Sequence, residues 1–117
     1  MTDRELLEFA AKAIDCSIVQ DDGESSVWIV PIKKDAGYGF WWSPLTDDGD
    51  ALRLAVKCSL LVHVVAYIPK ENAWGHVSCA WHGHRLRFEP ERFTDDPYSA
   101  TRRAIVRAAA EIGKAMP

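Results

Sequence analysis

Three helix-start signals, spread along a chain of 117 residues, constrain the fold more than any other feature of the sequence. Thr2 and Glu5 have the spacing of a capping box, in which each side chain bonds the other residue's backbone N–H. Asp47 precedes an alanine- and leucine-rich stretch and has the side chain of an N-cap. Asp96 is followed by Pro97, and proline suits the first helical turn. The sequence therefore predicts three helices, one at each end and one in the middle.

The segments between these helices have the composition of β-strands. Residues 27–32 and 38–42 are rich in β-branched and aromatic side chains and flank a short turn, which predicts a hairpin. Pro31 limits its strand to an edge position or a strand end. Residues 60–68 form a nearly continuous β-branched run, which predicts a strand covered on both faces. We expect His63, inside this run, to be a hydrogen-bonded core residue.

The middle helix is apolar around most of its circumference. Its thin polar stripe consists of Asp50, Arg53 and Lys57, and such a helix is typically buried. We therefore expect it to be the central helix of the core. The expected fold is a single α+β domain over residues 1–117, in the order α-β-β-α-β-β-β-α, with a mainly antiparallel sheet packed by helices. Residues 20–26 are polar and predict a loop.

The segment GHVSCAWHGH, residues 75–84, gathers three histidines and a cysteine and raises the question of a metal site. His82-Gly83 has the form of a two-residue hairpin turn. In that hairpin Cys79 lies about 10 Å back along its strand from the turn, so that it and the histidines cannot meet on one ion. The pattern predicts no metal site and no cofactor.

Folding the chain at this turn also predicts a strand register. Val77 then lies opposite Phe88, and Cys79 belongs to an apolar face that points into the core. Arg85 and Arg87 fall on the opposite, polar face and are candidate partner-binding residues.

The cysteines and the absence of catalytic motifs indicate a protein without enzymatic activity. Cys16, Cys58 and Cys79 all fall on predicted buried faces, whereas a nucleophilic cysteine needs an exposed, electropositive setting. An odd cysteine count and an N-terminus without signal-peptide character predict reduced thiols in a cytoplasm. The longest apolar run is too short to span a bilayer, so no membrane association is expected.

Charge is distributed unevenly along the chain. Residues 1–50 hold 11 acidic and 4 basic side chains, and residues 51–117 hold 6 acidic and 10 basic ones. The basic half could meet nucleic acid, but such proteins usually have a high pI, and the pI here is about 5.7. A nucleic-acid-binding regulator is therefore an alternative to a protein-binding module, and a small hydrolase is a third.

Two groups of side chains are candidates for a partner-binding surface. Trp41 and Trp42 are adjacent on a predicted strand, so they point to opposite faces and one of them is expected to be exposed. Arg102, Arg103 and Arg107 lie on the outer side of the last helix, where we expect them to be free to bind carboxylates or phosphates.

Two segments resemble a known group of proteins. WWSPLTDDGDALRLAVK (residues 41–57) and DDPYSATRRAIVRAAAEIG (residues 95–113) resemble segments of small uncharacterised proteins encoded by tailed phages and prophages of proteobacteria. The resemblance implies a phage genome context and carries no activity with it. In that context we expect a non-enzymatic accessory protein in the host cytoplasm that binds a host protein. Counter-defence inhibition of the anti-CRISPR kind is one such role, and a homodimer contact is an alternative use of the same surface.

Overall fold

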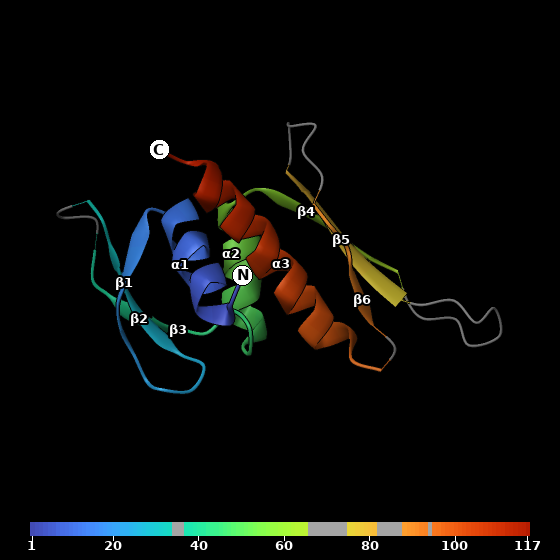
Figure 1. Ribbon diagram of the computed structural model, residues 1–117, viewed down its shortest axis with the longest axis horizontal. Coiled ribbons are helices and arrows are strands. Elements are labelled where there is room, and N and C mark those ends of the chain that lie inside the picture. The colour runs from blue at the N-terminus through green and yellow to red at the C-terminus, as the bar shows by residue number, and fades with distance from the viewer. Residues whose placement is uncertain (34–36, 66–74, 82–87, 94) are drawn as a thin grey trace.

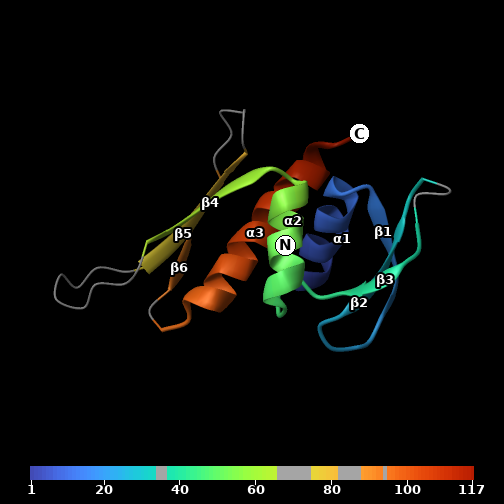
Figure 2. The ribbon, with the colours of Figure 1, turned by 180° about the vertical axis from the view of Figure 1, so that it is seen from behind.

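The computed structural model describes residues 1–33, 37–65, 75–81, 88–93 and 95–117. Within these residues, three helices lie between two three-stranded antiparallel sheets (Figures 1 and 2), which confirms the expected α+β class. The helices are α1 (Asp3–Ala13), α2 (Asp48–Lys57) and α3 (Pro97–Ala115). The first sheet consists of β1 (Cys16–Asp21), β2 (Val27–Pro31) and β3 (Phe40–Trp42). The second sheet consists of β4 (Leu60–Val65), β5 (Gly75–Trp81) and β6 (Glu91–Phe93).

The three helix starts are confirmed, each by the side chain expected to cap it. The Thr2 hydroxyl accepts a hydrogen bond from Glu5 N (3.1 Å), and the Glu5 carboxylate accepts one from Thr2 N (3.2 Å). Asp47 caps α2, and Asp96 caps α3 by accepting from the backbone N–H of Ser99. These bonds satisfy donors that the first helical turn leaves open, and so they fix where each helix begins.

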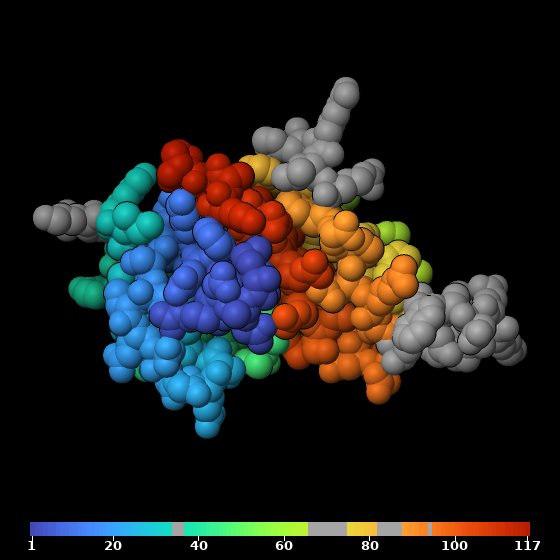
Figure 3. Space-filling view, viewed as in Figure 1, coloured from blue at the N-terminus to red at the C-terminus, as the bar shows by residue number. Residues whose placement is uncertain are grey.

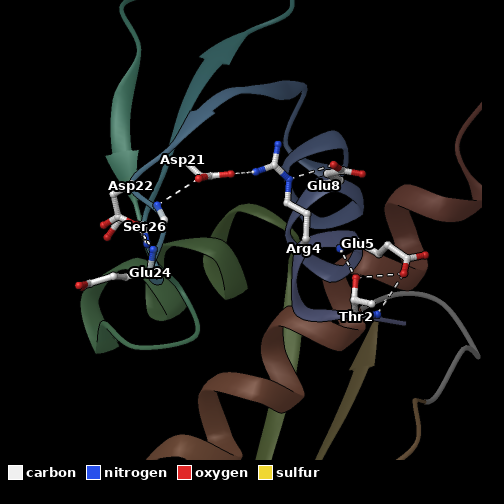
Figure 4. Close-up of polar contacts among 9 residues, drawn as sticks. Thr2, Arg4, Glu5, Glu8, Asp21, Asp22, Glu24 and Ser26 are labelled. Carbon is white, nitrogen blue, oxygen red and sulfur yellow. Dashed lines mark hydrogen bonds and ion pairs between the residues drawn. The ribbon is translucent and has the colours of Figure 1, made fainter.

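Polar contacts tie the start of α1 to the turn between β1 and β2 (Figure 4). Arg4 binds the carboxylates of both Glu8 (3.0 Å) and Asp21 (2.5 Å). The Asp22 side chain accepts hydrogen bonds from backbone N–H groups within the turn, including that of Ser26 (3.1 Å). Because these groups are exposed, we expect them to orient the turn more than they stabilise the fold.

Strand β1 is a difference from the predicted order, which had two strands before the middle helix. The predicted loop begins at residue 20, but β1 extends to Asp21 and pairs with β2. Asp15 has a φ of 58°, and this left-handed residue turns the chain sharply out of α1 and into the strand. A bulge between Ile18 and Gln20 interrupts the alternation that would have revealed the strand in the sequence.

The central helix is α3, and the prediction that α2 occupies this position is wrong. α3 packs against α1, α2 and the second sheet, and Figure 3 shows its C-terminal part (red) in contact with α1 (blue). On α2, by contrast, the side chains of Leu52 and Val56 are 64% and 71% exposed. Small side chains bring α3 close to its neighbours, and its buried residues are Ala100, Ala104, Ile105, Val106, Ala108, Ala109, Ala110, Ile112 and Gly113.

Strand β4 is also less buried than the sequence predicted. Its outer face is open, because Leu61 and His63 are exposed, and His63 is therefore not a core residue. Its inner face packs against the core through Leu60 and Val62. A continuous β-branched run is typical of strands covered on both sides, but it also suits a strand of which only one face is covered.

The predicted register of the histidine-rich hairpin is wrong by three residues. Val77 pairs with Glu91 of β6 and not with Phe88, whose N–H donates to the Cys79 carbonyl (3.1 Å). The antiparallel direction and the burial of Cys79 are as predicted. The expected turn at residues 82–83 lies outside the described residues. The different register does not change which face of β5 enters the core, since Val77 and Cys79 still share that face.

Candidate functional site

Strand β3 places its two tryptophans on opposite faces, as the sequence predicted. Trp42 points into the core and is 2% exposed, whereas Trp41 is 47% exposed on the outer face of the first sheet. Trp41 lies opposite Trp28 of β2, and the two rings meet edge to face with centroids 5.5 Å apart. This geometry is favourable for aromatic pairs and holds Trp41 in a defined position on the surface.

Gly39 provides the space that this arrangement needs. A Cβ at Gly39 would lie 2.5 Å from Trp28 Nε1 and 2.8 Å from the Ile29 carbonyl oxygen. The Trp28 indole thus lies directly over the glycine, next to the start of β3. On the same segment Tyr38 is 95% exposed and Phe40 is also exposed. We call Trp28, Tyr38, Phe40 and Trp41 together the aromatic edge.

A cleft of about 400 Å³ lies beside the aromatic edge, between the first sheet and α2. Its buried lining includes Cys16, Trp42 and Leu54, and Tyr38 and Phe40 stand exposed at its rim. An apolar floor with charged groups at the rim suits an apolar side chain that carries a polar end. The charged residues that line the cleft are Asp15, Lys33, Asp50, Arg53 and Lys57.

Asp50 closes one side of this cleft and joins α2 to the end of β3. Its carboxylate accepts a hydrogen bond from Ser43 N (2.9 Å) and binds Arg53 (2.7 Å). The Arg53 guanidinium also lies 3.8 Å from Asp47. These contacts hold Arg53 over the start of α2. Side chains of α2 therefore form one wall of the cleft, and the first sheet forms the other.

The arginines of α3 do not form the free basic surface that the sequence predicted. Arg102, Arg103 and Arg107 each bind a carboxylate of another element, so the expectation that they are free is wrong. The partners come from segments distant in sequence, where no local pattern could reveal them. Arg85 and Arg87 lie outside the described residues. The pairs are Arg102–Asp48 (2.7 Å), Arg103–Asp3 (2.9 Å) and Arg107–Glu91.

A second hollow, of about 380 Å³, was missed by the sequence reasoning. It lies among α2, β4 and the first turns of α3, and Leu52, Val64, Tyr98 and Ile105 contribute to its mainly apolar lining. We call it the α2–β4 groove. The sequence signal for this groove was the apolar circumference of α2. That pattern predicted a buried helix, but part of the apolar surface of α2 is exposed and lines the groove.

Comparison with protein-family models, curated proteins and solved structures finds no match for this chain. The resemblance to phage proteins stays a prediction. No helix in the described part of the chain is both long and apolar enough to cross a membrane. Among the described residues, no three or more His, Cys, Asp or Glu side chains are placed to hold a metal ion.

The three cysteines are buried, and burial raises the pKa of each thiol. For Cys58 and Cys79 the pKa rises to about 11. The thiolate is the reactive form of cysteine. A pKa that is two units higher lowers the ionised fraction of the thiol about a hundredfold at a pH below both values.

We expect these thiols to react slowly in the native protein. With Ellman's reagent near pH 8, Cys58 and Cys79 should react about a hundredfold more slowly in the native protein than a free thiol does, and Cys16 should also react more slowly. The same chain in urea should release three equivalents at once. A cysteine that reacts in the native protein at the rate of a free thiol would contradict its burial and reopen the case for thiol chemistry.

Proposed function

We propose that this protein is a non-enzymatic, phage-encoded accessory protein that acts in the host cytoplasm by binding a host protein. Counter-defence inhibition, in which the bound protein is part of a host defence system, is the role we propose for that binding. The aromatic edge is the surface that makes the contact. The phage context rests on the resemblance of residues 41–57 and 95–113 to phage-encoded proteins.

The observation that carries this proposal is the exposure of three aromatic side chains within residues 38–41, two of which line an open cleft. Tryptophan and tyrosine are enriched at the energetic centres of protein interfaces because they bury a large area at low entropic cost. Tyr38, Phe40 and Trp41 are all exposed. Tyr38 and Phe40 line the cleft, which has room for a partner side chain, and Trp41 lies on the outer face of β3. The buried thiols, with raised pKa values, support a binding role over a catalytic one.

The experiment compares the wild-type protein with a Trp41→Ala variant. Each is immobilised and exposed to lysate of the proteobacterial host, the captured protein is identified by mass spectrometry, and the purified partner is then titrated. We expect Trp41→Ala to raise the Kd about 30-fold, which corresponds to about 2 kcal/mol for a residue at the centre of an interface.

Val19→Ala is the matched control, because Val19 is an exposed apolar residue on β1, at the opposite edge of the same sheet. It should leave the Kd unchanged. Equal binding by wild-type protein, Trp41→Ala and Phe40→Ala would reject the aromatic edge as the contact surface. Capture of nucleic acid alone, with an affinity that falls linearly with salt on logarithmic axes, would support the alternative function as a nucleic-acid-binding regulator.

A further inference from the structure

Helix α2 places three of its charged residues along the cleft beside the first sheet. Asp50, Arg53 and Lys57 follow one another at helical spacing, and all three line the cleft together with the buried Leu54. The floor between α2 and the sheet is apolar, whereas the wall that α2 forms is charged. An occupant of this cleft must therefore match an apolar surface and a charged one at the same time.

The charges that line the cleft do not all pair with one another. The Asp50 carboxylate binds Arg53 (2.7 Å), so these two charges offset each other. Within the described part of the chain, the other three charged residues of the lining, Asp15, Lys33 and Lys57, form no ion pair. Two of these three exposed side chains are cationic. The lining therefore carries one positive charge in excess, which suits an anionic group.

The positive charge also acts at the floor of the cleft. Cys16 is buried there, and burial raises the pKa of its thiol. Two neighbouring charges act on this pKa in opposite directions: Lys57 lowers it and Asp15 raises it, and the effect of Lys57 is the larger. A charge that favours the thiolate favours a carboxylate near the same place, because both are anions.

We propose that the cleft receives a large apolar side chain of the host protein, next in sequence to an aspartate or glutamate whose carboxylate meets Lys33 and Lys57. The inference rests on the proposed function, because it names the part of the partner that this surface recognises. The apolar side chain fills the cleft of about 400 Å³ over Trp42 and Leu54. The carboxylate stays at the rim, where the lysine side chains are exposed and can reach it.

The surroundings of the cleft suit a protein segment better than a free small molecule. Tyr38 and Phe40 are exposed at the rim, and Trp41 continues the exposed aromatic surface on the other face of β3. A small ligand inside the cleft would leave these rings uncovered. A protein that inserts one side chain into the cleft can cover the aromatic edge with its neighbouring residues.

The test uses four capped tetrapeptides as probes, titrated against isotope-labelled protein and followed by two-dimensional NMR. Their sequences are Gly-Phe-Glu-Gly, Gly-Phe-Gln-Gly, Gly-Phe-Lys-Gly and Gly-Ala-Glu-Gly, so that each differs from the first at one side chain. The first should bind about three- to fivefold more tightly than the second, as expected for one exposed ion pair. The third and fourth should bind more weakly still. Binding should shift the indole N–H signal of Trp42, which lines the cleft, and leave that of Trp41 unchanged.

Variants of Lys57 separate charge recognition from general apolar binding. In Lys57→Glu the preference should reverse, so that the lysine peptide binds more tightly than the glutamate peptide, and Lys57→Gln should reduce the preference for glutamate. Lys57 is exposed, so both variants should keep the circular dichroism spectrum of the wild-type protein. Lys114→Glu is the matched control, because Lys114 is also a basic residue in the last turn of a helix but does not line the cleft. It should keep the wild-type preference.

Equal binding of the glutamate, glutamine and lysine peptides by the wild-type protein, or no binding of any of them, would overturn the proposal. A preference for glutamate that persists unchanged in Lys57→Glu would do the same. Tighter binding of free hydrocinnamate than of the first peptide would assign the cleft to a small ligand, and Trp42 signals that shift on dilution of the protein alone would assign it to a second copy; both results overturn the proposal. The proposed function fails separately, because its test is the partner affinity of Trp41→Ala, and Trp41 lies outside the cleft.

Discussion

Replacing Gly113 by alanine is expected to destabilise the protein by about 3 kcal/mol and to lower its Tm by on the order of 10–20 °C. Gly113 lies on α3 where this helix crosses α1. A Cβ at this position would lie 1.8 Å from the Phe9 carbonyl oxygen and 3.1 Å from Ala13 N. Because both are backbone atoms, no side chain can rotate away, and the two helices would have to separate. Thermal unfolding followed by circular dichroism measures the effect.

Gly49→Ala is the matched control, since Gly49 is also a helical glycine. The atoms nearest to its added Cβ belong to the side chains of Arg53 and Asp47, at 3.1 Å or more. The Arg53 side chain is largely exposed, so its flexible end can shift by a few tenths of an ångström while it keeps its carboxylate partners. Alanine also has a higher helix propensity than glycine, so this variant should be unchanged or more stable by up to about 1 kcal/mol. Equal Tm values for Gly113→Ala and the wild-type protein would show that α1 and α3 do not approach as closely as described.

Replacing Trp42 by alanine is expected to cost about 3–5 kcal/mol, because a large side chain is removed from the core and leaves a cavity. Trp42 is almost wholly buried on the inner face of β3, where it pairs with Val27 of β2. Its loss should also enlarge the cleft beside the aromatic edge, which Trp42 helps to line. Chemical denaturation measures the change in the free energy of unfolding.

Trp41→Ala is the control for this prediction, because it removes the same side chain from the other face of the same strand. It should cost about 1 kcal/mol, from loss of the edge-to-face contact with Trp28. The two variants thus separate stability from binding: Trp42→Ala mainly affects folding, and Trp41→Ala mainly affects partner affinity. Similar losses of stability in both would contradict the opposite orientations of the two rings.

The candidate site was predicted in part. Adjacent residues on a strand alternate by geometry alone, so one of Trp41 and Trp42 had to face outward wherever the strand lay. The partner-binding role of the α3 arginines was inferred from their outer position on a helix, and position on a helix says nothing about what lies opposite. Arg102 and Arg103 meet Asp48 and Asp3, which precede them by 54 and 100 residues.

Features that depend on interactions within a few residues could be predicted from the sequence. Helix starts are of this kind, because Thr2 and Glu5 bond one another across a single turn. The β2–β3 hairpin and the burial of the cysteines followed from composition and alternation in the same way. Three other features depend on packing between distant segments: which helix is central, the register of β5 against β6, and which face of β4 is exposed. Each of these features depends on which of several segments packs against the same element, and no short stretch of sequence reveals that. α3 takes the central position because its small side chains and Gly113 allow close approach on several sides, and α2 is left with Leu52 and Val56 at the surface.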